Sequence, residues 1–280
     1  MENRSRKLRA FFARYVAAIG QARDPRIVRA FAEVPREPFA GPGPWSISAA
    51  GVYLTTPDDD PAFLYQDTLI ALVPELGLNI GQPSAHAAWL DALALKEGES
   101  VIQVGAGSGY YTAILANLVG AGGRIHAFEI DPELAARAAA SLREYPWVNI
   151  RARSGIAEDL PKADAVYVCA GTTQPSWTWL DALRPGGRLV FPLQAPAAMG
   201  GMLWIRRPAH GKIWPARFLS GAMFIACSGP RDEAAGARLT VAFASRGAAT
   251  VRSFRIDSPR EDVCWFAGEG WWLSTAEPPS

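Results

Sequence analysis

Three glycines alternate with other residues directly after a short apolar run, at Gly105, Gly107 and Gly109. Residues 101–104 are mostly β-branched, as expected for a strand buried on both faces, and residues 111–118 have helical spacing. A turn without Cβ atoms between a strand and a helix lets a ligand lie against backbone N–H groups and the positive end of the helix. The segment is therefore predicted to bind a nucleotide-like ligand.

The glycine spacing distinguishes between two classes of nucleotide site. A dinucleotide-binding turn requires glycine at its first, third and sixth positions, whereas the sixth position here is Tyr110. The alternating pattern suits a ligand without a pyrophosphate. The next predicted strand, residues 124–130, carries Glu129 about 20 residues beyond the turn, where an acid holds a ribose diol. These features predict S-adenosylmethionine as the cofactor, with these candidate ligands: Gly105, Ala106, Gly107, Ser108, Gly109, Glu129 and Ile130.

Composition and charge are those of an ordinary globular protein. Of 280 residues, 49% are hydrophobic and 20% are charged, and the net charge is +1. Because there is no run of Lys or Arg, neither a nucleic-acid partner nor a membrane surface is expected. The three cysteines are far apart and form no CxxC pair, which favours a reduced, cytoplasmic protein without a metal site. No signal peptide and no membrane-spanning run is expected.

The N-terminal part is predicted to be helical with one long loop. Apolar residues recur at helical spacing in residues 5–33, in two pieces, and Asp24 with the proline after it caps the second piece. Residues 41–61 are rich in Gly, Pro, Ser and Asp and predict a loop with a short strand at 51–54. A further helix is predicted over residues 84–95.

From residue 100 to 194 predicted strands and helices alternate, including a helix over residues 132–145. This order is typical of an α/β fold with a doubly wound, mostly parallel sheet. The C-terminal strands are predicted at 202–205, 216–225, 239–244 and 253–256. They form either an antiparallel continuation of the sheet or a small appended lobe. The predicted division is 1–98 for the helical and loop extension, 99–195 for the cofactor-binding α/β core and 196–280 for a strand-rich C-terminal extension.

With three segments together, the chain resembles the protein-L-isoaspartate O-methyltransferases. Residues 29–39 look like that family's helix ending in Val-Pro-Arg, and residues 103–110 are close to its cofactor motif. Residues 77–83, Gly-Leu-Asn-Ile-Gly-Gln-Pro, are similar to its substrate loop, Gly-Gln-Thr-Ile-Ser-Gln-Pro. The resemblance spans residues 8–195 and implies a class I S-adenosylmethionine-dependent methyltransferase that esterifies isoaspartyl residues of proteins or peptides.

The chain departs from the family pattern mainly on the substrate side. Asn79 and Gly81 replace the family's Thr and Ser, whose hydroxyls are implicated in holding the carboxylate that is methylated. Gln103 replaces the acid usual in the first core strand. The family's Gly-Asp-Gly, which borders the adenine, corresponds here to a segment containing Ser154 and Gly155, and these two become further candidate cofactor residues.

The chemistry implied by the resemblance requires hydrogen-bond donors rather than an acid–base pair. A carboxyl group with a pKa of about 4 is already ionised near pH 7 and needs no general base. Transfer from a sulfonium to a carboxylate consumes one positive and one negative charge, so a desolvated pocket favours the reaction. His86 is expected either to contact the substrate or to pack on its neighbours. The candidate catalytic residues are Asn79, Gly81, Gln82, Ser84 and His86.

Three functions remain open from the sequence. The first is methylation of isoaspartyl residues in damaged proteins or peptides. The second is methylation of a different carboxyl group or small-molecule acceptor, with the altered loop and the tail setting specificity. The third is a non-catalytic relative that acts as an interaction module. The Trp-rich tail is expected either to pack on the main sheet or to bind a partner, and the sequence predicts no oligomeric state.

Overall fold

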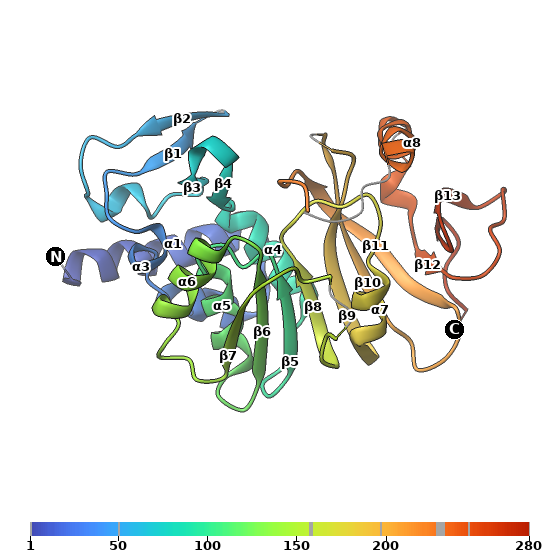
Figure 1. Cartoon of the computed structure of the whole chain (residues 1–280), viewed down its shortest axis with the longest axis horizontal. Helices are drawn as coiled ribbons and strands as arrows, with labels where there is room; N and C mark the ends of the chain where they lie inside the picture. The colour runs from blue at the N-terminus through green and yellow to red at the C-terminus, as the bar shows by residue number, and fades with distance from the viewer. Residues whose placement is uncertain are drawn as a thin grey trace. The chain divides into compact units, whose positions relative to one another are not determined.

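The computed structural model describes residues 2–49, 51–156, 159–196, 198–227, 233–245 and 247–279 (Figure 1). Its contacts define two compact units: Met1–Glu99 with Ala106–Arg153, and Ser100–Gly105 with Ser154–Ser280. The predicted division at residues 98 and 195 is a different partition and stays a prediction. In the described part of the chain, no helix is long and apolar enough to cross a membrane.

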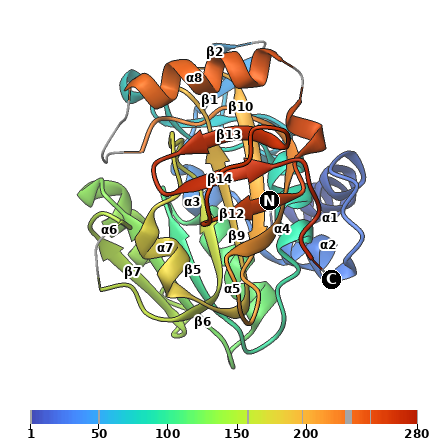
Figure 2. The same cartoon turned by 90° about the vertical axis from the view of Figure 1, so that its right-hand side faces the viewer.

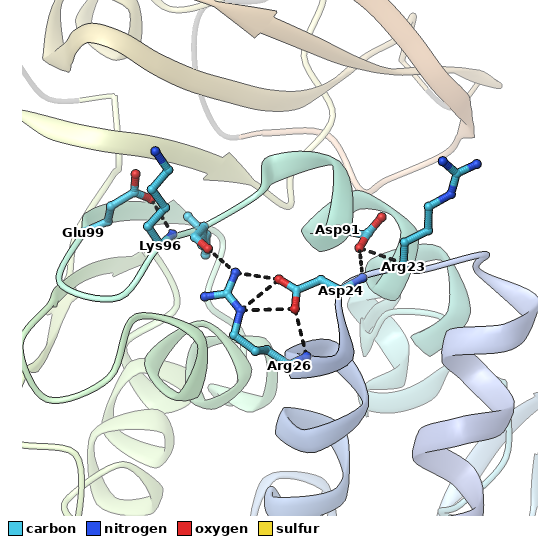
Figure 3. Close-up of polar contacts among 7 residues, drawn as sticks. Arg23, Asp24, Arg26, Asp91, Lys96 and Glu99 are labelled. Atoms are coloured by element: carbon cyan, nitrogen blue, oxygen red, sulfur yellow. Dashed lines mark hydrogen bonds and ion pairs between the residues drawn. The ribbon is translucent and has the colours of Figure 1, made fainter.

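The first unit begins with the two predicted helices, α1 (Glu2–Ile19) and α2 (Pro25–Glu33), and they are tied to a third, α4 (Pro83–Leu93). Asp24 caps α2, because its Oδ1 accepts a hydrogen bond from Arg26 N at 2.9 Å. The Arg26 side chain also bonds to this carboxylate, and that bond is the main reason that the pKa of Asp24 is lowered. Asp91 of α4 accepts from Arg23 N at 3.0 Å and from Asp24 N at 2.8 Å (Figure 3). These bonds hold α4 against the start of α2.

A four-stranded antiparallel sheet precedes α4. Its order is β2-β1-β3-β4, and its strands are β1 (Ser46–Ala49), β2 (Val52–Thr55), β3 (Ile70–Val73) and β4 (Leu78–Ile80). The short strand predicted at 51–54 is confirmed as β2, but the predicted loop contains β1 as well. The short helices are α3 (Glu37–Ala40), η1 (Pro61–Phe63) and η2 (Pro74–Leu76). Since β4 leads through Gly81 and Gln82 into α4, this sheet and helix hold both ends of the acceptor loop, here defined as residues 77–84.

The rest of the first unit alternates helix and strand: α5 (Tyr110–Val119), β6 (Arg124–Glu129), α6 (Pro132–Ser141) and β7 (Val148–Ala152). β6 and β7 are parallel. Asp131 caps α6 by accepting from the backbone N–H groups of Glu133 and Leu134. The helix was predicted to reach Tyr145 but ends at Ser141, with Leu142 as its C-cap residue. Pro146 disfavours the helical conformation only at the predicted last residue, Tyr145.

The second unit contains a sheet in the order β13-β14-β12-β11-β10-β9-β8-β5, and its helix α7 (Trp177–Ala182) leads into β9. Its parallel strands are β5 (Ser100–Val104), β8 (Ala163–Val168) and β9 (Leu183–Leu193). Its antiparallel strands are β10 (Gly200–Arg206), β11 (Ile213–Ala222), β12 (Ser253–Arg255), β13 (Cys264–Gly268) and β14 (Trp271–Ser274). Of the two predictions for the tail, the antiparallel continuation of the sheet is therefore confirmed.

One predicted strand of the tail is wrong. Residues 239–244 form the end of a helix, α8 (Glu233–Ala244), which lies beside β13 (Figure 2). Its Thr, Val and Phe favour a strand locally, but its alanines and its leucine favour a helix. The buried residues of α8 are Ala235, Gly236 and Leu239, which lie within about one turn of one another. A 3-10 turn, η3 (Ala248–Thr250), follows, and the β13–β14 hairpin beyond it was not predicted.

Candidate functional site

The glycine turn has the backbone conformation that its sequence predicts. Gly105, Gly107 and Gly109 have φ angles of 78°, 56° and 96°, in the left-handed region that favours glycine. A Cβ on Gly109 would lie 2.9 Å from Leu142 Cδ1, so this glycine is also required by the packing of α6. A Cβ on Gly107 would meet only Leu72 Cδ1, at 3.6 Å. Within the first unit, the face of the turn at Gly107 is therefore open.

Glu129 at the end of β6 is bonded to this turn. Its Oε2 accepts from Gly107 N at 2.6 Å and its Oε1 accepts from Asp131 N at 3.0 Å, while Ala106 N donates to Phe128 O at 3.1 Å. Each carboxylate oxygen can accept a second bond, which fits the two hydroxyls of a ribose diol. The structure thus brings Glu129 and Gly107 together, and the ribose contact itself stays a prediction. The adjacent Ile130 is 54% exposed and offers an apolar surface.

A buried hydroxyl in the same turn points to a missing partner. Ser108 is 2% exposed, and its Oγ has no hydrogen-bond partner among the described residues. Leaving a buried polar group unsatisfied costs about 1–3 kcal/mol. A ligand that completes this bond would remove that cost. With the carboxylate of Glu129 and the open Gly107, the residues of the first unit fit S-adenosylmethionine.

The remaining cofactor candidates belong to the second unit. Gly105 directly follows β5, and a Cβ there would lie 3.1 Å from Cys169 O, just beyond β8. Ser154 Oγ accepts from Ile156 N at 3.4 Å. Gly155 is buried, and its carbonyl accepts from Trp179 Nε1 at 2.8 Å. The Gly155 carbonyl is therefore already paired.

Asp67 organises the acceptor loop, and the sequence did not identify it. Its Oδ1 accepts from Ser84 N at 2.8 Å, and its Oδ2 accepts from Ser84 Oγ at 2.6 Å and from Gln82 Nε2 at 3.1 Å. Gln82, the residue before α4, provides no side-chain cap for the helix. Asp67 therefore acts as the cap of α4 from 17 residues upstream. Two of the predicted substrate donors, Gln82 and Ser84, are bonded to this carboxylate.

His86 fills the space in which the family has a side chain at position 81. A Cβ on Gly81 would overlap His86 Nε2. The imidazole stacks on Tyr111 at 3.5 Å with an interplanar angle of 2°, and Tyr111 OH donates to Gly81 O at 2.5 Å. His86 is 1% exposed, and burial, with a smaller effect of the Arg36 charge, lowers its pKa to about 3. The ring is thus neutral near pH 7, and it packs beneath the loop.

Asn79 lies on β4 opposite Ala71 of β3. Its Nδ2 donates to Gly77 O at 2.8 Å. Its side chain also hydrogen-bonds to Tyr53, whose pKa is nevertheless raised because the phenol is partly buried. Asn79 is therefore engaged in holding the β3–β4 region together. Within the described ranges, no group of His, Cys, Asp and Glu is arranged to hold a metal ion.

Comparison with known proteins identifies the family. The model of the family "Protein-L-isoaspartate(D-aspartate) O-methyltransferase (PCMT)" matches residues 12–229. Two proteins of Anaeromyxobacter sp. (strain Fw109-5) are similar. Protein-L-isoaspartate O-methyltransferase 2 is 34% identical over 206 residues, 70% of this chain and 76% of the relative. Protein-L-isoaspartate O-methyltransferase 1 is 38% identical over 191 residues, 66% of this chain and 80% of the relative.

Solved structures agree on the fold. A protein-L-isoaspartate O-methyltransferase aligns with a TM-score of 0.62 at 20% identity, over 80% of this chain and 65% of that one. A Plasmodium falciparum protein described as a putative protein-L-isoaspartate O-methyltransferase, in complex with S-adenosyl-L-homocysteine, also has a TM-score of 0.62, at 18% identity over 79% of this chain and 98% of that one. The predicted α/β methyltransferase fold is confirmed. The chain belongs to the protein-L-isoaspartate(D-aspartate) O-methyltransferase family, a family of S-adenosylmethionine-dependent enzymes.

Proposed function

We propose that this protein transfers a methyl group from S-adenosylmethionine to the side-chain carboxylate of isoaspartyl residues in damaged proteins or peptides. The observation that carries the proposal is the bond between Glu129 Oε2 and Gly107 N, which joins the acid and the glycine turn into one polar platform. The proposed compartment is the cytoplasm, where three cysteines without a disulfide-like spacing would stay reduced.

The residues assigned to the cofactor belong to the glycine turn, the end of β6 and the segment after β7. Glu129 would accept from the ribose hydroxyls, Gly107 would leave room for the nucleoside, and Ser108 would gain a partner for its hydroxyl. Gly105, Ala106, Gly109, Ile130, Ser154 and Gly155 are proposed to complete the binding site. When bound, S-adenosylmethionine supplies an electrophilic methyl group on a positively charged sulfur.

The acceptor loop is proposed to orient the substrate carboxylate and to exclude water. Because this carboxylate is already ionised near pH 7, no residue has to remove a proton, and the neutral His86 agrees with that. Asp67 and His86 are positioning residues in this proposal, since they fix the backbone at Gln82 and Gly81. The backbone at Gly81 and Gln82 is proposed to provide the donors, because Ser84 donates to Asp67 and Asn79 donates to Gly77.

One observation favours a second acceptor class. The family's serine hydroxyl has no counterpart at Gly81, and the space for it is taken by His86. A protein that lacks this hydroxyl would suit a different carboxyl group or a small-molecule acceptor.

Methyl transfer from labelled S-adenosylmethionine tests both candidates. The substrates are an isoaspartyl peptide and the same peptide with normal aspartate. Transfer only to the isoaspartyl peptide is expected, and the Glu129→Ala variant should abolish most of it at low cofactor concentration. If the protein binds S-adenosylhomocysteine but methylates neither peptide, the isoaspartyl proposal is wrong and the second acceptor class is favoured.

A further inference from the structure

The second unit contains a pocket of about 210 Å³ next to the ends of two parallel strands. Residues 171–179, which follow β8, and residues 194–196, which follow β9, form most of its wall. Ile156 and residues 226–227 complete it. In open α/β sheets, ligands bind outside the carboxyl ends of the strands. The pocket therefore lies where this fold places ligands.

Several hydrogen-bonding groups in the pocket wall already have partners within the protein. Thr172 Oγ1 donates to Gln174 O at 2.5 Å, and Ser176 Oγ lies 2.7 Å from Thr178 Oγ1. The Gln194 amide exchanges two bonds of 2.8 Å with the backbone of Phe224. These groups are thus used in shaping the wall.

Thr173 is the exception. It is 4% exposed, lines the pocket, and its Oγ1 has no hydrogen-bond partner among the described residues. A buried hydroxyl without a partner is costly, so Thr173 Oγ1 offers a hydrogen-bonding group to a ligand in the pocket.

The C-terminal extension contacts the wall of this pocket. A Cβ on Gly236 of α8 would lie 3.1 Å from Pro196 Cδ and 3.8 Å from Thr173 Cγ2, so α8 covers these two residues. A Cβ on Gly270, in the β13–β14 turn, would lie 3.2 Å from Trp177 Cζ2. The extension therefore supports the wall at Thr173 and at Trp177.

The remaining lining selects a neutral ring. Among the described residues that line the pocket none is charged, so they offer no partner to a charged group that loses its hydration there. The indole of Trp177, which is 44% exposed, lies in the wall with Ile156, Pro175 and Pro196. A cavity of about 150 Å³ is known to bind benzene, so this larger pocket admits a ring with a substituent. A phenol combines such a ring with one hydroxyl for Thr173.

We infer that this pocket binds a tyrosine side chain of the peptide substrate. The inference rests on the proposed function. The pocket shares its wall with the proposed cofactor segment, because Ile156 follows Gly155 and Trp179 donates to Gly155 O. After β8, the pocket lining begins at Gly171, two residues beyond Cys169. The backbone of Cys169 lies against Gly105 of the glycine turn.

A peptide series tests the inference. Isoaspartyl peptides carry Tyr, Phe, Ala or Lys at each position flanking the isoaspartyl residue, and kcat/KM is measured for methyl transfer. At one position, Tyr should exceed Phe by about fivefold, the effect of one neutral hydrogen bond, and Lys should be the poorest. Thr173→Val, which keeps the shape of the side chain, should remove the preference of Tyr over Phe without changing the affinity for S-adenosylhomocysteine. Equal rates for all peptides would overturn the inference and leave the proposed function standing.

A second measurement does not depend on methyl transfer. Binding of p-cresol and of toluene to the full chain is followed by ligand-observed NMR. We expect p-cresol to bind more tightly than toluene, and Thr173→Val to abolish the difference. If S-adenosylhomocysteine displaces p-cresol, the pocket belongs to the cofactor and the inference is wrong. If p-cresol binds as expected but no isoaspartyl peptide is methylated, the proposed function fails while the phenol site stands; absence of p-cresol binding removes the site itself.

Discussion

The glycine turn and the acceptor loop are both proposed to hold backbone close to a ligand, but different contacts fix the two segments. In the turn, one acid, Glu129, accepts from the Gly107 and Asp131 backbone within a single βαβ unit. In the loop, the Gln82 and Ser84 donors are bonded to Asp67, which is distant in sequence. The turn thus presents an acceptor to its ligand, whereas these loop donors are occupied within the protein. Residues of the loop are therefore fixed by packing partners outside the motif.

The largest effect is expected when the family's residue is restored in the loop. Gly81→Ser should destabilise the protein by about 3 kcal/mol, because its Cβ overlaps the buried His86 ring. Urea denaturation measures this loss. If Gly81→Ser instead leaves the stability unchanged and raises isoaspartyl activity, the loop can accept the family's serine. His86 would then not restrict position 81, and the proposed difference between the loop and the turn would be wrong.

A double-mutant cycle separates the clash from other effects of serine. In a His86→Ala background, Gly81→Ser should cost far less, giving a coupling energy of about 2 kcal/mol between the two sites. Additive costs would show that His86 does not limit position 81.

Glu129→Gln tests the other side of the comparison. The amide keeps the shape of the side chain but removes its charge and half of its acceptor capacity. Affinity for S-adenosylhomocysteine, measured by calorimetry, should fall by about 2 kcal/mol, the value of hydrogen bonds to a charged group. Glu133→Gln, a change of a neighbouring acid in the first turn of α6, is the matched control and should bind normally. Unchanged affinity in Glu129→Gln would mean that the ribose lies elsewhere.

The same contrast explains what the sequence could predict. The glycine turn, Glu129 and the strand–helix order are local patterns, and the structure contains them. The role of Asp67 depends on a contact across 17 residues, and the role of His86 depends on space at Gly81, so neither follows from a motif. The strand predicted at 239–244 was wrong because the periodicity of a short apolar run does not distinguish a strand from a buried helix. The structure buries Ala235 and Leu239 on one side of a helix.

The pH dependence of stability reports the burial of His86. Its pKa is about 3 in the folded protein against 6.5 for an imidazole in water, so the unfolded chain binds the proton first as the pH falls. The stabilising contribution of neutral His86 is complete above the unfolded pKa and is lost as the pH falls towards the folded pKa. At about pH 5 the loss should be about 2 kcal/mol relative to pH 7 or above. Urea denaturation of the protein and of His86→Leu should show a weaker acid dependence in the variant; parallel curves would place the imidazole in contact with solvent.

Asp67→Asn should have the smallest effect. It tests whether the acceptor loop depends on the negative charge of Asp67 or only on the shape of its side chain. Asparagine keeps one acceptor for Ser84 or Gln82 but loses the second, together with the negative charge at the start of α4, for a cost in stability of about 1 kcal/mol. Because the freed loop would orient the acceptor less well, KM for an isoaspartyl peptide should rise severalfold while the affinity for S-adenosylhomocysteine stays unchanged. Glu75→Gln, which removes the same charge from an exposed residue of η2, should change neither quantity. A lower KM in Asp67→Asn would give the opposite answer: the carboxylate would then compete with the substrate for Gln82 and Ser84, and these donors would belong to the acceptor site after all.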